Sequence, residues 1–351
     1  MRAIKYYGKK DLRFIDIDKP RAGAGQVLVK VIYCGICGTD VHAYKEGGIF
    51  NWELIPGHET VGIVEETGSG VTCVKAGDRV AVGPPGDCGK CYSCNTGHPN
   101  TCENAFVNTL GIGPETQGAY AEYVLSHFPQ NELFKIPDNV RLDQAVLFDV
   151  IGVGFHAVRK SRLKLGENAV VSGCGSIGLS IIQAAKMAGA RNVIAFDFSE
   201  TRRKAALAAG ADYALSPESE EDKNTAKKIL SHEGGAHVSF EAAGAPSSVA
   251  ACVEYTMANG QVIIVGSDGR PYELISAAMG PKEYDLQFVF TYTKEEIHML
   301  FEMISSGKWS TDVYSVQKAE FDETIEKIEA LADGSLDVAR VLIMPNGKEI
   351  S

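Results

Sequence analysis

The sequence predicts an α/β protein in which a mostly-β domain is interrupted by a doubly wound domain with a parallel sheet. Short apolar segments between Gly, Pro and Asp turns fill the first 150 residues, which is typical of β-structure. From about residue 166, strands alternate with helices of about ten residues or more, as in βαβ units. Too few elements follow residue 290 for a third domain, so we expect them to complete the first.

The first domain is predicted over residues 1–150 and its completion over residues 289–351. Its strands are short apolar runs bounded by turn residues, and we place them at residues 26–32, 60–65, 79–82 and 120–125. The returning part is predicted to contain helices at residues 295–306 and 321–333 and a strand at residues 338–344.

The inserted domain is predicted over residues 151–288. A buried-strand pattern at 168–172 leads into helical periodicity at 176–188. Ser199 is a candidate N-cap for the next helix, at 202–209. The remaining predicted elements are strands at 192–196, 212–215, 237–241 and 261–266 and helices at 221–231 and 247–257.

Composition and charge exclude several classes of protein. The 351 residues include 34 Lys and Arg against 45 Asp and Glu, a net charge of −11, and 45% are hydrophobic, as in an ordinary globular protein. No apolar run approaches the roughly 20 residues that span a bilayer, and the N-terminus does not resemble a secretory leader. We therefore expect a cytoplasmic protein. Its acidic balance argues against nucleic-acid and membrane partners.

The turn Gly173-Cys-Gly-Ser-Ile-Gly178 lies between a predicted strand and a predicted helix. Gly173 permits the tight turn, Gly175 lets the backbone approach a pyrophosphate, and Gly178 lets the helix pack closely on the strand. The helix then begins at Ser176, where free N–H groups face the phosphates. This context distinguishes a dinucleotide site from an ordinary glycine-rich turn.

Asp197 ends the next predicted strand, where a carboxylate can accept hydrogen bonds from the hydroxyl pair of a ribose. The same carboxylate would repel a 2′-phosphate, so the sequence favours NAD over NADP. Arg202, a further candidate cofactor contact, and Arg203 follow closely and weaken this preference slightly.

The nine cysteines are an odd number, so they cannot all form disulfides within one chain. Four of them follow the spacing Cys88-x2-Cys91-x2-Cys94-x7-Cys102 on one short loop. Such crowding in a chain without a leader favours metal over disulfides. Four thiolates form a closed tetrahedral zinc site with no position for substrate, so we predict a structural role. The alternative is a cluster of reduced thiols or redox pairs.

A second metal constellation begins at Cys37 and continues at His58. These two residues supply a sulfur and a nitrogen ligand, and the carboxylates of Glu59 and Asp149 could add a third ligand. A mixed site with an open position is what catalytic zinc requires. Taken alone, Cys37 and His58 would by default be interpreted as a buried small residue and a turn histidine. The dinucleotide turn and the four-cysteine loop on the same chain favour the metal.

The whole chain resembles the zinc-dependent medium-chain alcohol dehydrogenases, in particular the sorbitol (polyol) and threonine dehydrogenase branch. The motifs that carry the resemblance occur in family order: Cys37-Gly-Thr-Asp, Gly57-His-Glu, the Cys88/91/94/102 spacing, Gly118-Ala-Tyr-Ala-Glu-Tyr and Gly173–Gly178. The resemblance implies a GroES-like catalytic domain with an inserted Rossmann NAD-binding domain. It also implies a homo-oligomer, either a dimer or a tetramer.

The resemblance assigns the zinc ligands and marks one departure. Cys37 and His58 match the catalytic zinc ligands, and Glu59 matches the adjacent Glu that coordinates zinc or lies beside it. Where the branch usually has Glu-Pro, this chain has Asp149-Val150. We keep Asp149 as a candidate ligand whose shorter side chain could act through water.

The resemblance also assigns the proton path. Thr39 matches the hydroxyl that takes the proton of the substrate, and His42 matches the histidine that passes it through the ribose to solvent. Asp40 is expected to orient the Cys37 loop. Three further residues are implied at the cofactor: Ile177 and Val153 beside the nicotinamide, and Arg340 at the pyrophosphate.

We therefore expect an NAD-linked dehydrogenase with two Zn²⁺ ions per chain. Its expected substrate is the secondary hydroxyl of a polyol, sugar or sugar acid, or the matching ketone. The polyol preference rests on Glu59 beside His58, and a threonine-type amino alcohol is the alternative. A further hypothesis is a non-catalytic, zinc-stabilised NAD-binding sensor or scaffold. Such a protein would not need the catalytic zinc constellation and its proton path together.

Overall fold

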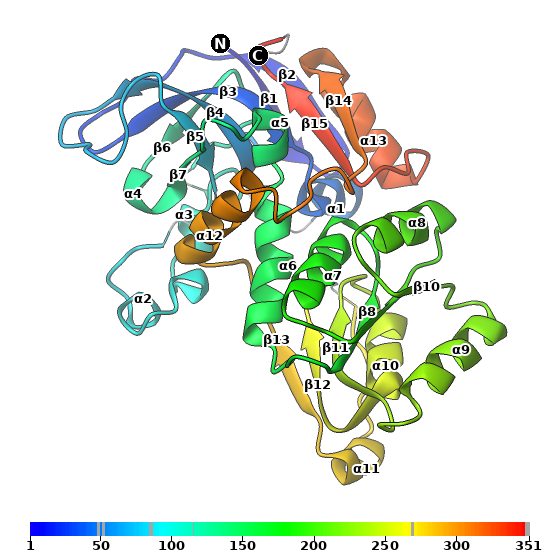
Figure 1. Ribbon diagram of the computed structural model, residues 1–351. Coiled ribbons are helices and arrows are strands. Elements are labelled where there is room, and N and C mark those ends of the chain that lie inside the picture. The colour runs from blue at the N-terminus through cyan, green and yellow to red at the C-terminus, as the bar shows by residue number, and fades with distance from the viewer. Residues whose placement is uncertain (48–49, 51–52, 84–86, 115, 268–269, 348–351) are drawn as a thin grey trace. The chain divides into compact units, whose positions relative to one another are not determined.

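The computed structural model describes residues 1–347 except 48–49, 51–52, 84–86, 115 and 268–269. The chain divides into two compact units (Figure 1). The first unit comprises Met1–Asp149, Thr293–Thr311 and Ser315–Ser351, and the second comprises Val150–Tyr292 and Asp312–Tyr314. In the sequence, the second unit is thus inserted between segments of the first.

The second unit contains a parallel sheet with helical crossovers, which confirms the predicted α/β class. The strand order is β10-β9-β8-β11-β12-β13, and each neighbouring pair is parallel. The strands are β8 (Asn168–Ser172), β9 (Asn192–Phe196), β10 (Tyr213–Leu215), β11 (Ala236–Glu241), β12 (Thr256–Ile264) and β13 (Asp285–Phe288). The strand order reverses between β8 and β11, which makes this pair the topological switch point of the sheet. In sheets of this kind, ligands bind at the carboxyl ends of the strands beside the switch point.

Helices cover both faces of this sheet (Figure 1). The helices of this unit are α7 (Ser176–Met187), α8 (Glu200–Ala208), α9 (Glu220–Leu230) and α10 (Pro246–Tyr255), with the short α11 (Ser276–Met279) and the 3₁₀ turn η2 (Gly280–Lys282) between β12 and β13 in the sequence. On one face, Leu230 of α9 and Tyr255 of α10 pack with Val170 and Ile194. Strand β8 is buried along its whole length because both of its faces are covered. The helix predicted to residue 257 ends at Tyr255, since Thr256 already belongs to β12.

The first unit contains a mostly antiparallel sheet in the order β14-β15-β3-β4-β5-β7, with β6 also paired to β3. Its strands are β3 (Val27–Gly35), β4 (Glu59–Thr67), β5 (Arg79–Val82), β6 (Tyr123–Ser126), β7 (Leu133–Lys135), β14 (Val316–Glu320) and β15 (Arg340–Met344). Strands β1 (Arg2–Gly8) and β2 (Asp11–Asp16) form a separate antiparallel pair. The strand predicted at 120–125 begins only at Tyr123, although Ala121 forms an isolated bridge to Ala3.

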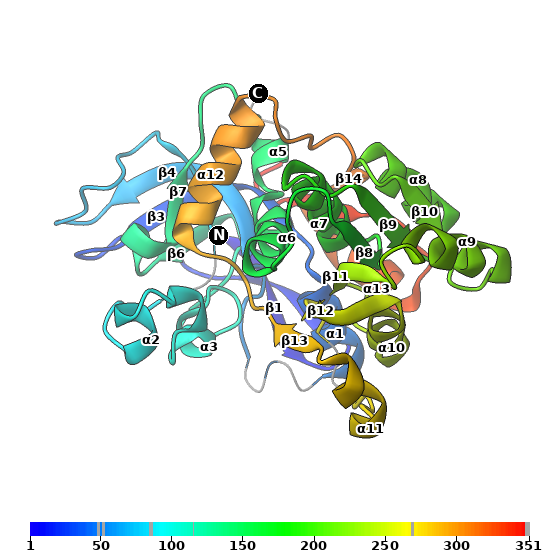
Figure 2. The ribbon, with the colours of Figure 1, turned by 60° about the horizontal axis from the view of Figure 1, so that its bottom comes forward.

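Short helices connect these strands. They are α1 (Gly38–Glu46), α2 (Tyr92–Asn95), α3 (Ala105–Asn108), α4 (Pro129–Glu132), α5 (Leu142–Ala145), α12 (Lys294–Ser305) and α13 (Thr324–Asp333), with 3₁₀ turns η1 (Pro99–Thr101) and η3 (Phe321–Glu323). Helix α6 (Phe148–Lys160) begins in the first unit and continues in the second. Figure 2 shows α2 and α3 together on the loop that carries the four clustered cysteines.

Candidate metal centres and dinucleotide turn

Strand register brings Cys37 close to His58 and Glu59. In the antiparallel pair of β3 and β4, Gly35 lies opposite Glu59. Cys37 follows β3 as the N-cap of α1, and His58 directly precedes β4. The end of one strand and the start of the next therefore hold two distant segments of sequence side by side.

A thiol, an imidazole and a carboxylate converge at this point. One ligand atom each from Cys37, His58 and Glu59 lies within 4.8 Å of the others. His58 is only 4% exposed and Glu59 only 1%, and the buried Nδ1 of His58 makes no hydrogen bond among the described residues. A sulfur, a nitrogen and an oxygen donor gathered in one buried group fit a divalent cation. A set of three such ligands is typical of catalytic zinc.

The charges of this group also favour a cation. Burial raises the pKa of the Cys37 thiol, and the nearby Glu59 carboxylate raises it further. Burial acts to lower the pKa of His58, but Cys37 and the carboxylates of Asp40 and Glu59 raise it well above its usual value. Cys37 and His58 therefore share a proton in the absence of a metal, and a bound dication would take the place of that proton.

Arg340 balances part of the negative charge. Its buried guanidinium donates from Nη2 to Glu59 Oε1 at 3.0 Å and from Nη1 to the Ile36 carbonyl at 2.8 Å. The contact of Arg340 with the cofactor pyrophosphate stays a prediction. A buried guanidinium is costly unless it is paired, and Glu59 supplies that pairing within the first unit.

Asp149 is not among the three residues of this ligand group, so its role as a further zinc ligand, directly or through water, stays a prediction. It is buried in the first turn of α6. Burial acts to lower the pKa of Arg340, whereas Glu59, Cys37 and Asp149 raise it. The start of α6 thus places the Asp149 carboxylate where it balances the charge of Arg340.

Gly35 makes room for the Glu59 carboxylate. A Cβ atom at Gly35 would lie 2.3 Å from Glu59 Oε2, far inside van der Waals contact. We expect Gly35→Ala to displace Glu59 and to lower the zinc affinity of the group about tenfold to a hundredfold, as measured by competition with a chelator. Gly38→Ala is the matched control, because a Cβ there meets nothing within 4 Å. An equal loss in both variants would contradict this steric role.

The predicted proton path lies on α1. Thr39 Oγ1 is 3.6 Å from Cys37 Sγ, so this hydroxyl lies beside the ligand group. The side chain of His42 is 56% exposed, and its Nδ1 lies 3.8 Å from the Glu46 carboxylate. Asp40 is buried, and its Oδ2 accepts the Cys37 N–H at 3.0 Å. The helix therefore has a hydroxyl at the metal group and an imidazole at the surface.

The four clustered cysteines also converge. The sulfur atoms of Cys88, Cys91, Cys94 and Cys102 lie within 4.8 Å of one another. Each of these cysteines is a free thiol, and the Cys91 and Cys94 sulfurs are 3.4 Å apart. Backbone N–H groups lower the pKa of Cys88 to about 6, and burial raises that of Cys94 to about 12. Four sulfur donors in this arrangement fit a closed zinc site.

The loop around these cysteines, here called the lobe (residues 88–108), has little apolar core. Its helices α2 and α3 have four residues each. The side chains of Tyr92 and Phe106 are 78% and 66% exposed. We therefore expect ligation by a metal to contribute much of the stability of this loop.

The glycine turn of the second unit shows three different uses of glycine. Gly173 has φ +100°, and a Cβ there would lie 2.7 Å from the Ala243 nitrogen. A Cβ at Gly175 would meet nothing within 4 Å, whereas one at Gly178 would lie 1.9 Å from the Gly173 carbonyl oxygen. Only the position before the N-terminus of α7 is open, and this is where a pyrophosphate would approach the backbone.

Asp197 is held beside this turn by backbone donors. Its Oδ2 accepts the Cys174 N–H at 2.8 Å, and its Oδ1 accepts the Ser199 N–H at 2.9 Å. Ser199 in turn caps α8, whose first turns include the exposed Arg202. The remaining predicted cofactor residues are half-buried: Ser176 and Ile177 at the start of α7, and Val153 on α6.

Comparison with known proteins identifies the family of the chain. Residues 23–138 match the alcohol dehydrogenase GroES-like domain, and residues 176–306 match the zinc-binding dehydrogenase family. Human sorbitol dehydrogenase is 33% identical over 95% of this chain and 93% of its own length. The chain belongs to the zinc-dependent medium-chain alcohol dehydrogenase family.

Two further proteins are similar to this alcohol dehydrogenase. The L-threonine 3-dehydrogenase of Pyrococcus furiosus is 33% identical over 76% of this chain and 74% of its own. The structure of 2R,3R-butanediol dehydrogenase from Bacillus subtilis is 31% identical, covers 98% of this chain and 99% of that chain, and has a TM-score of 0.86. The mostly-β first unit is therefore GroES-like, and the parallel sheet of the second is a Rossmann sheet.

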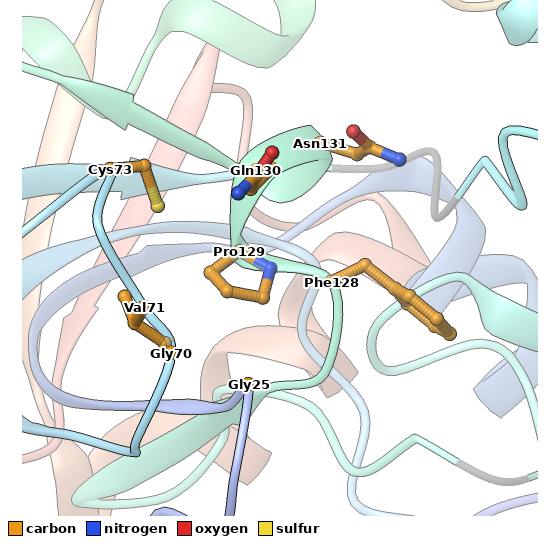
Figure 3. A pocket seen from close by; sticks show the side chains of 8 residues that line it. All are labelled: Gly25, Gly70, Val71, Cys73, Phe128, Pro129, Gln130 and Asn131. Atoms are coloured by element: carbon orange, nitrogen blue, oxygen red, sulfur yellow. The ribbon is translucent and has the colours of Figure 1, made fainter.

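A cavity of about 270 Å³ in the first unit of the dehydrogenase lies among loops and contains none of the predicted site residues. Figure 3 shows Cys73, Phe128, Pro129 and Gln130 around it. Its lining has no charged side chain. In the described part of the chain, no helix is long and apolar enough to cross a membrane.

Sequence reasoning missed two features of the dehydrogenase site. The partner of Glu59 is Arg340, and the partner of Asp40 is the hydroxyl of Tyr120. An arginine in the apolar strand β15 signals that a buried acid must lie near it, but it does not say which one. Tyr120 lies within the Gly118-Ala-Tyr-Ala-Glu-Tyr motif, but this motif does not indicate which residue the Tyr120 hydroxyl contacts.

Proposed function

We propose that this dehydrogenase transfers a hydride between NAD(H) and the secondary hydroxyl of a polyol, sugar or sugar acid, or the matching ketone. The observation that carries the proposal is the buried convergence of Cys37, His58 and Glu59. Three protein ligands leave a fourth position for a substrate oxygen, whereas the four thiols of the lobe leave none. We therefore propose Zn²⁺ at both groups, two ions per chain.

The residues of the first unit would have separate roles in metal binding and proton transfer. When bound, zinc makes the substrate hydroxyl more acidic, and nicotinamide accepts the hydride from the carbinol carbon. Thr39, 3.6 Å from Cys37 Sγ, would accept the hydroxyl proton as it passes on its own, and the exposed His42 would release a proton to water. Burial of His58 and Glu59 keeps bulk water away from the ligands.

The substrate class is supported by the relatives. Human sorbitol dehydrogenase and the Bacillus subtilis butanediol dehydrogenase are named for a polyol and a diol. A threonine-type amino alcohol is the second candidate, because the Pyrococcus furiosus relative is an L-threonine 3-dehydrogenase. NADH formation should be followed across polyols, sugars, sugar acids and amino alcohols. Turnover of the amino alcohols alone would select the second candidate, and no turnover of any of them would refute the proposal.

We expect Asp197→Ala to weaken NAD binding about tenfold or more while NADP binding changes little. Two backbone N–H groups hold the carboxylate at the glycine turn, where it can accept bonds from a ribose and repel a 2′-phosphate. A single hydrogen bond to a charged group contributes roughly 1.5–3 kcal/mol. Titration of the protein with each cofactor measures both affinities.

Asp212→Ala is a suitable control for Asp197→Ala. Its carboxylate also accepts a backbone N–H, from Val193 at 2.7 Å, but it lies outside the glycine turn. We expect this control to keep the parental ratio of NAD to NADP affinity. The same ratio in Asp197→Ala would mean that the ribose is recognised elsewhere.

Assembly as a dimer or tetramer stays a prediction that rests on the family resemblance. Light scattering of the purified protein measures the mass of the particle directly. A particle of the mass of a single chain would contradict the prediction.

A further inference from the structure

Tyr120 is joined to the loop that carries Cys37. Its side chain is fully buried, with 0% exposure. The hydroxyl donates to Asp40 Oδ2 at 2.9 Å, and the same oxygen accepts the Cys37 N–H at 3.0 Å. A single carboxylate oxygen therefore connects Tyr120 to the backbone of a predicted metal ligand.

Tyr120 is also joined to the loop that carries His58. A Cβ atom at Gly57, which has φ +95°, would lie 2.4 Å from Tyr120 Cδ1, so the ring packs directly on this glycine. The Tyr120 N–H donates to the Pro56 carbonyl at 2.9 Å, and the Ala119 N–H donates to the Gly57 carbonyl at 2.8 Å. Gly57 is the residue directly before His58.

The hydroxyl of Tyr120 stays a donor in this environment. Burial raises the pKa of Tyr120 well above its usual value, and the Asp40 charge raises it further. The other oxygen of Asp40, Oδ1, is buried and makes no hydrogen bond in the described part of the chain. Tyr120 is thus the side chain whose hydrogen bond fixes the orientation of this carboxylate.

We propose that Tyr120 is a positioning residue, which holds Cys37 and His58 at the spacing that zinc requires by contacting Asp40 and Gly57. The inference rests on the proposed zinc site at Cys37, His58 and Glu59. Tyr120 acts on the two loops and supplies no ligand itself. If the loops were not held, zinc binding would have to order them, and its affinity would fall.

Tyr120→Phe tests the hydroxyl while the ring stays on Gly57. We expect the zinc affinity of the Cys37 group to fall about tenfold to a hundredfold, while the lobe keeps its metal. Competition with a chelator measures the affinity, and the visible spectrum of the Co²⁺-loaded protein reports the geometry of the thiolate site. Tyr6→Phe is the matched control, because Tyr6 is also buried and its hydroxyl donates to the Ala43 carbonyl at 3.2 Å. This control should leave both readouts unchanged.

A double-mutant cycle separates positioning from general stability. If Tyr120 acts through Asp40, then Tyr120→Phe combined with Asp40→Asn should bind zinc no more weakly than Asp40→Asn alone. Additive losses, or parental affinity in Tyr120→Phe, would overturn the inference. A parent chain that binds one metal ion only, in the lobe, would overturn the proposed function and this inference with it.

Discussion

His58→Ala should lower turnover about a thousandfold or more, while the chain keeps its fold and its NAD affinity. The substitution removes one of three donors that lie within 4.8 Å of one another, which leaves too few protein ligands for zinc. Metal catalysis supplies several kcal/mol of charge stabilisation, and each tenfold change in rate corresponds to about 1.4 kcal/mol. Steady-state kinetics measure the loss, and metal analysis should find one zinc ion fewer per chain.

His127→Ala is the control for this prediction. His127 is also in the first unit, where a ring nitrogen lies 3.1 Å from the Gln26 amide, and it belongs to neither ligand group. We expect this variant to keep parental turnover and two zinc ions per chain. NAD titration should give the parental affinity for both variants, because the glycine turn is in the second unit. Parental turnover in a His58→Ala protein that has lost one zinc ion would refute the catalytic role.

The features that the sequence could predict are short-range. Four cysteines within 15 positions leave the backbone little freedom to keep their sulfurs apart, and the structure brings all four together. The three glycines of the Gly173–Gly178 turn each serve a local steric need, so their spacing indicates the turn without any knowledge of the sheet. The carboxylate of Asp197 reaches the turn because parallel neighbours end at the same edge of the sheet.

The features that the sequence could not predict depend on strand register. Arg340 reaches Glu59 because β15 pairs with β3, with Leu342 opposite Gly35. The two partners are 281 positions apart, and no local pattern encodes this register. The position of the Asp149 carboxylate depends likewise on tertiary structure, because it is set by where α6 begins. A family motif predicts that such residues matter, but only the pairing of the strands decides what each one contacts.

The second large effect is expected in the lobe. Cys102→Ser should remove its metal ion and raise the population of the opened loop about a thousandfold. A ligand present at a thousand times its Kd stabilises the folded form by about 4 kcal/mol, and this stabilisation disappears with the ligand. Apolar burial adds little to the stability of the lobe, since its helices are short and its aromatic side chains Tyr92 and Phe106 are exposed. Limited proteolysis within residues 88–108 measures the opening.

Cys73→Ser is the control, because Cys73 is a half-buried thiol in the same unit and lies outside both ligand groups. It should keep two zinc ions and the parental cleavage rate, and a Cys102→Ser protein that did the same would contradict a structural metal.

Cys102→Ser and His58→Ala should each lose one zinc ion, but with opposite consequences. The first should open the lobe while uncleaved molecules keep turnover within about tenfold of the parent. The second should lose turnover while the lobe stays closed. Because metal loss is common to both variants, this contrast separates a metal ion that holds the fold from one that acts on the substrate.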